Sequence, residues 1–239
     1  MLEIYNKLKN SLREHAEKND LFGKKVAIKF KTLTPTEAIG NPEDQDYPII
    51  KGKEKMVEAE FEGCKGQAFT DEYGNASYTI HEILDLELNS NRKRAEFIAT
   101  FNAVYRYLGL CDKTVHCRDS EPGQCGRDLL KVIDPDKKIL LVGLQPRLLE
   151  AIASRQEIRV IDLDPDNTGK VKFGITVETE DKTSEGIKWC DELFVTGSTI
   201  VNGTIDRFLN IGKPVTFFGV TISAPAVVLD LNTYCSLGH

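Results

Sequence analysis

The stretch ILLVGLQPRLLEAIASRQEIRVIDLD, residues 139–164, decides the fold. Two short apolar runs, residues 139–144 and 158–163, are typical of strands, and residues 146–154 between them favour a helix. A strand, a helix and a second strand in this order predict parallel pairing, because the helix carries the chain back to the edge at which the first strand began.

The same alternation continues beyond this stretch. Repeated units of this kind predict one parallel sheet covered by helices. The further elements that we expect are a strand at 171–177, a helix ending near 189, a strand at 192–196, a helix at 199–209, a strand at 215–220 and a helix near 224–231.

The residues before this region follow a different pattern, with strands and helices that do not alternate. Residues 2–18 have the apolar stripe of an amphipathic helix, and residues 25–31 alternate as a half-buried strand does. A long loop at 35–55 precedes a hairpin at 56–61 and 66–70, and helices are expected at 80–88 and 92–108. The expected fold class is therefore α/β in two domains, with an α+β domain at 1–114 and a parallel-sheet domain at 115–239.

The composition limits the cellular setting and the partners. The chain of 239 residues is 41% hydrophobic and 28% charged, which excludes collagen-like and wholly disordered chains. Its net charge of −6 disfavours nucleic acid as a partner. No run approaches the roughly 20 apolar residues of a membrane span, and the polar first residues lack the apolar core of a secretory signal. We therefore expect a cytoplasmic protein with neither a membrane nor a nucleic-acid partner, and the pattern leaves a homo-oligomer open.

A glycine and an acid follow the first two strands of the predicted parallel sheet. Gly143 ends the first strand, and Asp162 closes the second, 19 residues later, a spacing that suits an acid binding ribose hydroxyls. Gln145 and Pro146 stand where further glycines would cradle a pyrophosphate, so the dinucleotide fingerprint is incomplete. Alternatively, these residues are only a strand-end glycine and surface acids.

The segment TGSTIVNGT, residues 196–204, follows another strand and is the more specific signal. Its glycine permits a tight turn, and the backbone N–H groups at the start of the next helix attract a phosphate or carboxylate. Ordinary capping is the alternative, but it leaves the helix-disfavouring Asn-Gly pair unexplained. The candidate ligand-binding residues here are Thr196, Gly197, Ser198, Thr199, Asn202 and Thr204.

Six cysteines stand out in a chain without any C-x-x-C pair. Thiols stay reduced in the cytoplasm, and thiolates with imidazole suit a soft transition metal such as zinc, copper or iron. Alternatively, individual cysteines are buried and inert, an interpretation that applies most readily to Cys64 and Cys111. The candidate metal ligands are His116, Cys117, Asp119, Cys125 and Cys190, brought together from distant segments.

Four polar residues of the first half are further candidates for a ligand site. Thr70 and Asp71 end a strand, where polar groups often face a cleft, while Arg94 and Asn102 are polar residues of an otherwise apolar helix. The alternative, which the sequence favours, places Asp71 in a turn and the two helix residues on a solvated face.

Several of these segments together, in this order, resemble the putative heavy-metal chelation family of prokaryotes. The resemblance implies an N-terminal domain similar to the capping domain of enolase, a C-terminal Rossmann-like domain and a site in the cleft between them. The motifs that carry it are GKEKMVEAEF, GQAFTD, RAEFIATFNAV, TVHCRD-x-x-P-x-x-CG, VGLQP, IDLDPDN, WCD, TGSTIVNGTID and FFGVTIS.

Three hypotheses about function follow from these patterns. The first is heavy-metal chelation or binding of a small anionic or metal-chelating ligand in the cleft between the domains, together with a soft metal. The second is a transferase of the methyltransferase type that holds an adenosyl or nucleotide cofactor, with Asp162 as the residue that tests it. The third is a scaffold without catalysis. The pattern leaves the substrate, the reaction and the identity of the metal open.

Overall fold

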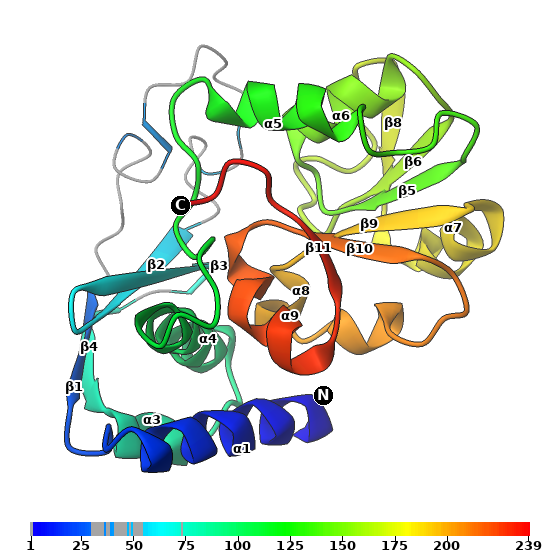
Figure 1. Cartoon of the computed structure of the whole chain (residues 1–239). Coiled ribbons are helices and arrows are strands. Elements are labelled where there is room, and N and C mark those ends of the chain that lie inside the picture. Colours follow the sequence, from blue (N-terminus) through cyan, green and yellow to red (C-terminus); the bar gives the residue numbers. More distant parts are fainter. Residues whose placement is uncertain are drawn as a thin grey trace.

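The computed structural model describes residues 2–29, 36, 39–40, 47, 49, 55–72 and 74–239. Most of the loop expected at 35–55 and the last part of the strand expected at 25–31 lie outside these residues. Figure 1 shows the described part as two bodies of secondary structure, each built around its own sheet.

The first sheet has four strands in the order β3-β2-β1-β4, and every neighbouring pair is antiparallel. Residues 62–63 join β2 to β3. The second strand of this hairpin therefore begins at residue 64, two residues earlier than the sequence predicts. The elements are α1 (Leu2–Lys18), β1 (Lys25–Lys29), β2 (Lys55–Phe61), β3 (Cys64–Thr70), β4 (Ala76–Thr79), α3 (Ile80–Asp85) and α4 (Asn91–Tyr107).

The second sheet has seven strands in the order β11-β10-β9-β5-β6-β8-β7, and all neighbours are parallel except β7 and β8. This mostly parallel sheet, flanked by helices, confirms the predicted α/β class. The elements are α5 (Glu121–Leu129), β5 (Ile139–Val142), α6 (Pro146–Ala153), β6 (Ile158–Ile161), β7 (Val171–Lys172), β8 (Ile175–Glu178), α7 (Thr183–Trp189), β9 (Glu192–Thr196), α8 (Thr199–Asn202), β10 (Val215–Phe218), α9 (Ser223–Leu229) and β11 (Asn232–Tyr234).

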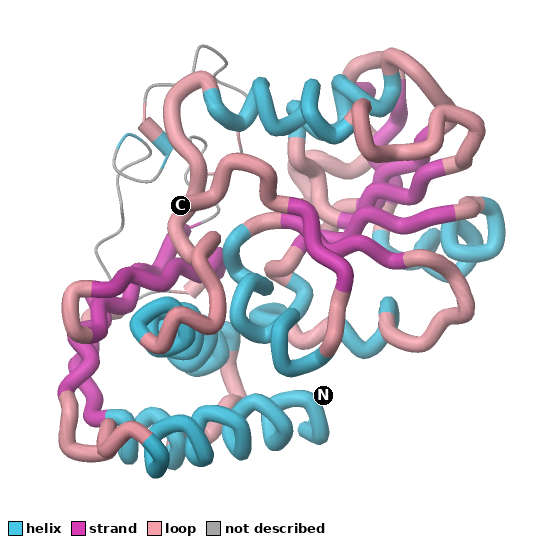
Figure 2. Tube along the Cα trace, viewed as in Figure 1, coloured by secondary structure: helices cyan, strands magenta, loops and turns pink. Residues whose placement is uncertain are grey.

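The strands of the second sheet alternate between two apolar layers, as the period of a strand requires. Ile139 and Leu141 pack in one cluster with the helices α5 and α6, whereas Leu140 and Val142 join the other cluster with α8 and α9. Figure 2 shows these two helix layers on opposite sides of the magenta strands. None of the described helices combines the length and apolar character that crossing a bilayer requires.

Three local predictions differ from the structure. The strand expected at 171–177 is a hairpin of β7 and β8, because Phe173 and Gly174 both have positive φ angles, 50° and 80°. The helix expected at 199–209 stops after one turn at Gly203, whose φ is 83°, and continues as the 3-10 turn Ile205–Phe208. No helix is expected between residues 108 and 139, yet α5 begins at Glu121, with Pro122 in its first turn.

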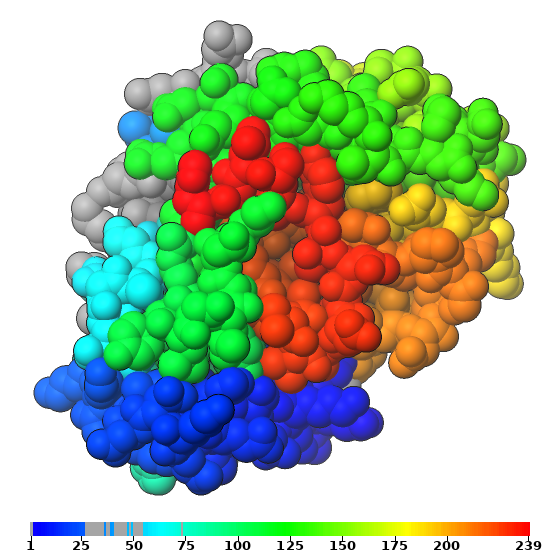
Figure 3. Space-filling model, in the orientation of Figure 1, coloured from blue at the N-terminus to red at the C-terminus, as the bar shows by residue number. Residues whose placement is uncertain are grey.

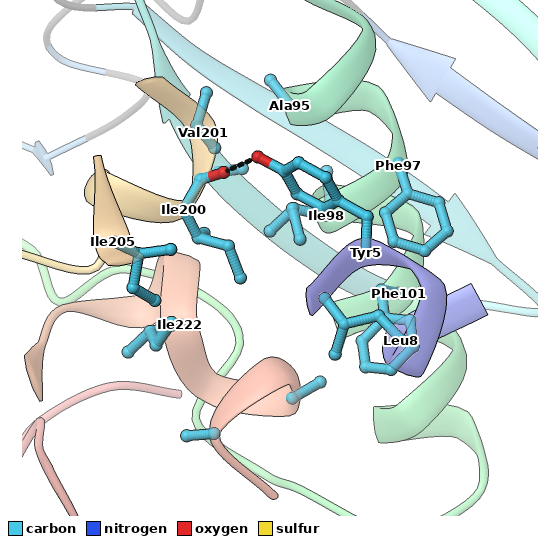
Figure 4. Packing of buried hydrophobic residues seen from close by; sticks show 14 of the residues in the cluster. Tyr5, Leu8, Ala95, Phe97, Ile98, Phe101, Ile200, Val201, Ile205 and Ile222 are labelled. Atoms are coloured by element: carbon cyan, nitrogen blue, oxygen red, sulfur yellow. Dashed lines mark hydrogen bonds between the residues drawn. The ribbon is translucent and has the colours of Figure 1, made fainter. Parts of the chain in front are cut away.

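One apolar core runs through both bodies. The buried face of α1 packs on α3 and α4, and the same cluster includes residues of α8 and α9 from beside the second sheet. Figure 4 shows Tyr5 of α1 reaching Ile200 of α8, where the tyrosine hydroxyl donates to the carbonyl oxygen at 2.5 Å. The division of the chain at residue 115 stays a prediction, because the packed interior is continuous across it.

The side-chain amide of Asn102 joins α4 to both bodies. Asn102 is fully buried, and its nitrogen donates to the carbonyl oxygens of Gln67 on β3 at 3.0 Å and of Val220 at 3.1 Å. Its oxygen accepts from the backbone nitrogen of Ala224 on α9 at 2.9 Å. Gly66 allows this close approach of β3 to α4, since a Cβ there would lie 2.3 Å from the backbone nitrogen of Ala103.

We expect Asn102→Ala to destabilise the protein strongly. The substitution leaves buried polar backbone groups without partners, so the free energy of unfolding should fall by about 3 kcal/mol. Urea denaturation followed by circular dichroism measures this change. Asn89→Ala, at an exposed position before α4, should change it by less than about 0.5 kcal/mol. Equal effects of the two substitutions would contradict this role of Asn102.

Candidate functional site

A pocket of about 360 Å³ lies at the carboxyl ends of the parallel strands. We call it the strand-end pocket. From β5 the chain proceeds to β6 and β8 on one side of the sheet and returns to β9 and β10 on the other, so the connections diverge between β5 and β9. Ligand sites of open parallel sheets occur at such divergence points. Its polar lining includes Thr70, Asp71, Asp162, Asp164, Glu180, Thr183, Thr196, Ser198, Thr199, Asn202, Thr204 and Arg207.

Gly143 sets the width of the pocket at its base. It has a positive φ of 87°, and a Cβ at this position would lie 2.6 Å from Cγ2 of Thr196. No side chain fits between the ends of β5 and β9 without displacing Thr196. The glycine that the sequence analysis singles out therefore lies on the wall of the pocket, as part of a tight backbone approach.

Asp162 lines the pocket and also forms hydrogen bonds with the turn after β5 and the turn after β6. Its Oδ2 accepts from the backbone nitrogen of Leu144 at 2.6 Å, and its Oδ1 accepts from the backbone nitrogen of Asp164 at 2.8 Å and from the Asn167 amide at 3.2 Å. A carboxylate offers about four acceptor positions. About one position, on Oδ2, is left for a ligand.

The segment 196–204 contributes hydroxyl groups rather than a helix terminus. Thr199 donates through its hydroxyl to the carbonyl oxygen of Thr196 at 2.8 Å, and the Oδ1 atom of Asn202 accepts from the hydroxyl of Thr204 at 2.7 Å. The helix α8 has four residues, so it is too short to concentrate a positive potential at its start, as the anion-binding prediction requires. Gly197 packs against Ile222 instead, where a Cβ would lie 2.9 Å from the Ile222 Cβ.

The first sheet forms the opposite wall of the pocket. Thr70 and Asp71 line it from the end of β3, and the amide of Asn91 donates to Asp71 Oδ1 at 2.8 Å. Arg94 lies behind this wall, where its Nε donates to the carbonyl oxygen of Val201 and its Nη2 to Asn91, both at 2.5 Å. Neither Arg94 nor Asn102 is among the lining residues; both fasten the walls together.

The described lining is acidic. Four carboxylates, those of Asp71, Asp162, Asp164 and Glu180, face one guanidinium, that of Arg207, which is itself 3.2 Å from Glu180. Like charges repel in a partly enclosed site, so this lining disfavours an anionic ligand. It favours a neutral or cationic ligand with hydroxyl groups, in contrast to the anion that the sequence analysis expects.

A second cavity of about 110 Å³, the side chamber, adjoins the pocket and shares Phe69, Gly143, Asp162, Thr196 and Ser198 with it. Its other described lining residues are Ile39, Tyr47, Ile49, His116, Leu144, Gln145, Pro146, Phe218, Gly219 and Thr221. His116 is the member of the predicted metal set that reaches this cavity.

Backbone contacts fix the segment that carries His116. The backbone nitrogen of His116 donates to Oε1 of Gln67 at 2.8 Å, and Val115 exchanges two backbone hydrogen bonds with His239 at 2.8 and 2.9 Å. Figure 3 shows the C-terminal residues, in red, lying against this green segment. Burial lowers the pKa of His116, so its imidazole is neutral near pH 7.

Burial keeps the thiols of Cys117 and Cys235 protonated near pH 7. Burial raises the pKa of the Cys117 thiol, and the nearby thiols of Cys125 and Cys235 raise it further. Burial likewise raises the pKa of Cys235 to about 11. A thiol with a raised pKa is a poor nucleophile near pH 7.

Among the described residues, no three histidine, cysteine, aspartate or glutamate side chains are grouped to hold a metal ion. Cys190 precedes the amino end of β9, whereas the pocket is at its carboxyl end, roughly 13 Å away at the rise of a strand. The Asp119 backbone nitrogen bonds to the Ile39 carbonyl oxygen at 2.8 Å. Cys190 therefore lies away from the pocket. His116 and Cys117 are adjacent, with 3.8 Å between Nδ1 and Sγ, and the Cys125 thiol is near Cys117. The metal-binding role of these residues stays a prediction.

Several lining residues were missed by the sequence analysis. Glu180 and Thr183 follow the carboxyl end of β8, so the strand-end rule applied to the strand expected at 171–177 could have found them. Asn91 and Arg207 carry no comparable signal, because a helix start and an irregular turn bring them to the pocket.

Comparisons with known proteins agree with this fold. Residues 128–231 match the model of the family described as "Putative heavy-metal chelation" (DUF364), which confirms the resemblance over these residues. No curated protein matches the chain.

Two solved structures of proteins of unknown function from this family are similar. One, from Pyrococcus horikoshii, has 17% identity and a TM-score of 0.59 over 91% of this chain and 79% of that one. The other, from Desulfitobacterium hafniense DCB-2, has 13% identity and a TM-score of 0.47 over 73% of this chain and 71% of that one.

We expect Gly143→Ala to destabilise the protein through two separable effects. The left-handed backbone disfavours a Cβ, and the new methyl group meets Thr196 Cγ2, so the free energy of unfolding should fall by about 3 kcal/mol. Thr196→Ser removes Cγ2 and should restore about 1 kcal/mol when combined with Gly143→Ala. Urea unfolding of both single variants and the double variant measures this coupling. Strictly additive effects would show that the two residues are not in contact.

Proposed function

We propose that this protein binds a small hydroxylated organic ligand of the nucleoside class in the strand-end pocket, and that Asp162 accepts a hydrogen bond from a ligand hydroxyl. The observation that carries the proposal is the position of Asp162, which has an acceptor position left beside the diverging ends of β5 and β9. This is where a doubly wound sheet holds the ribose of its ligand.

The strand order supports a Rossmann-like assignment for the second sheet. Counted from β5, the parallel strands follow the order 3-2-1-4-5-6 of classic doubly wound nucleotide-binding sheets, with the short β7 added at one edge. The N-terminal enolase-like domain that the family resemblance implies would supply the wall with Thr70 and Asp71.

The chemistry of the lining supports a nucleoside over a nucleotide. The turn after β5 continues from Gly143 with Leu144, Gln145 and Pro146, so it lacks the glycines that let a backbone approach a pyrophosphate. The four carboxylates would repel phosphate groups. A neutral or cationic ligand without phosphate groups needs no such glycines and is not repelled by the carboxylates.

The family description adds a role for metal, and we assign that metal to the ligand. A metal-chelating ligand brings its own donor atoms, and the acidic lining would offset the positive charge of its complex. Chelation by the protein alone would need several ligands at one point, which the described side chains do not form.

A second candidate is a transferase that uses an adenosyl cofactor with a sulfonium group. The specific observation in its favour is the same acidic lining, which complements a sulfonium cation, together with the hydroxyl-binding position at Asp162. Both candidates place the ligand in one pocket, so they differ in the probe that binds.

Calorimetric titration with adenosine, S-adenosylmethionine and ADP tests the proposal. We expect adenosine to bind and ADP to bind more weakly, because its phosphates meet the carboxylates. Asp162→Asn should weaken adenosine binding by roughly tenfold or more, since a hydrogen bond to a charged group is lost. S-adenosylmethionine binding tighter than adenosine would favour the transferase.

The control is Asp136→Asn, the same change of charge at an exposed position before β5, which should leave affinity unchanged. Repeating the titrations with Zn²⁺ alone tests chelation by the protein. Tight Zn²⁺ binding without any organic ligand would contradict our assignment of the metal to the ligand. No response to any organic probe would contradict the proposal and leave the scaffold hypothesis.

A further inference from the structure

One ring nitrogen of His116 is hydrogen-bonded within the protein, and the other can still form a hydrogen bond. Its Nδ1 lies 2.6 Å from the carbonyl oxygen of Cys117. A carbonyl oxygen can only accept, so Nδ1 carries the proton of the neutral ring, and Nε2 carries the lone pair. No described residue forms a hydrogen bond with Nε2. His116 lines the side chamber, and Nε2 is its ring nitrogen that can still accept a hydrogen bond.

The ring of His116 is held in one orientation. It meets the ring of Phe69 edge to face, with 5.5 Å between centroids and 87° between planes. The backbone nitrogen of His116 is bonded to Gln67, whose own side chain donates to Oε2 of Glu58 at 2.8 Å. An acceptor fixed from three sides loses little entropy when a ligand binds to it.

The size and walls of the chamber define what fits beside that acceptor. A cavity of roughly 150 Å³ holds benzene in a protein core, so the 110 Å³ of the side chamber, which adjoins the strand-end pocket, holds a group no larger than one small ring. Ile39, Ile49 and Phe218 give it apolar walls. A group with an apolar body and one O–H or N–H donor satisfies both the walls and Nε2 of His116.

We propose that the ligand of the strand-end pocket carries such a group, that this group occupies the side chamber, and that Nε2 of His116 accepts its hydrogen bond. This assignment of the side chamber rests on the proposed function, because it places a second part of the same ligand in a cavity that adjoins the strand-end pocket and shares walls with it. It assigns His116 to ligand selection rather than to a metal.

Phenol and anisole are matched probes for the chamber. Both have one aromatic ring, but only phenol has an O–H donor. In titrations followed by NMR, phenol should bind the wild-type protein with a Kd on the order of 1 mM. Anisole should bind about tenfold more weakly, the worth of one hydrogen bond. His116→Phe keeps a ring against Phe69 and should remove the preference for phenol, while His81→Phe, an exposed histidine of α3, should keep it.

The ¹⁵N shifts of the wild-type histidines provide a second test that needs no variant. His116 should show a protonated Nδ1 and an unprotonated Nε2, and phenol should shift Nε2. A proton on Nε2, equal affinities for the two probes, or a preference for phenol that survives in folded His116→Phe would each overturn the proposal. If phenol behaves as expected and no nucleoside binds, the proposed function fails and the assignment of the chamber stands.

Discussion

The buried amide of Asn102 is the contact on which the site depends. It bonds at once to β3, to the turn after β10 and to α9, so it fixes the end of the first sheet against the carboxyl ends of the second. Thr221 reinforces this joint by accepting, through its hydroxyl, from the backbone nitrogen of Phe69 at 3.1 Å. Because Phe69 and the two residues after it form one wall of the pocket, a shift at this joint would change the shape of the cavity directly.

Some side chains at or behind the pocket hold its walls together, and others are available to bind a ligand. The Asp162 carboxylate accepts hydrogen bonds from two backbone nitrogens. The guanidinium of Arg94 donates to carbonyl and amide oxygens of the walls. Such bonds hold the cavity open before a ligand arrives, which lowers the entropy lost on binding. The remaining acceptor position on Asp162 is then available to the ligand, whereas the hydroxyls of Thr199 and Thr204 already donate within segment 196–204.

The periodic features of the sequence predicted the parallel sheet and the pocket, because strand ends and helix stripes depend on neighbouring residues alone. The prediction of a single strand at 171–177 was wrong, because the two consecutive residues with positive φ that turn the chain there give no periodic signal in the sequence. Asn102 resembled a solvated residue in the pattern of α4, since β3, the turn after β10 and α9, which bury it, are distant in the sequence. The sequence lists the cysteines but not their positions in space, and Cys190 lies before the amino end of β9, whereas the pocket is at its carboxyl end. No three described histidine, cysteine, aspartate or glutamate side chains are grouped to hold a metal ion.

The charge of the cavity bears on how the family description applies to this chain. A protein that chelates a soft metal directly would gather thiolates at its site, yet neither Cys117 nor Cys235 lines the pocket. The groups that do line it are carboxylates and hydroxyls, which recognise hydroxylated and positively charged partners. A ligand that arrives as a metal complex has both properties. Under the proposed function, a small molecule that supplies the soft donor atoms would give this cavity a role in heavy-metal chelation without any cysteine as a metal ligand.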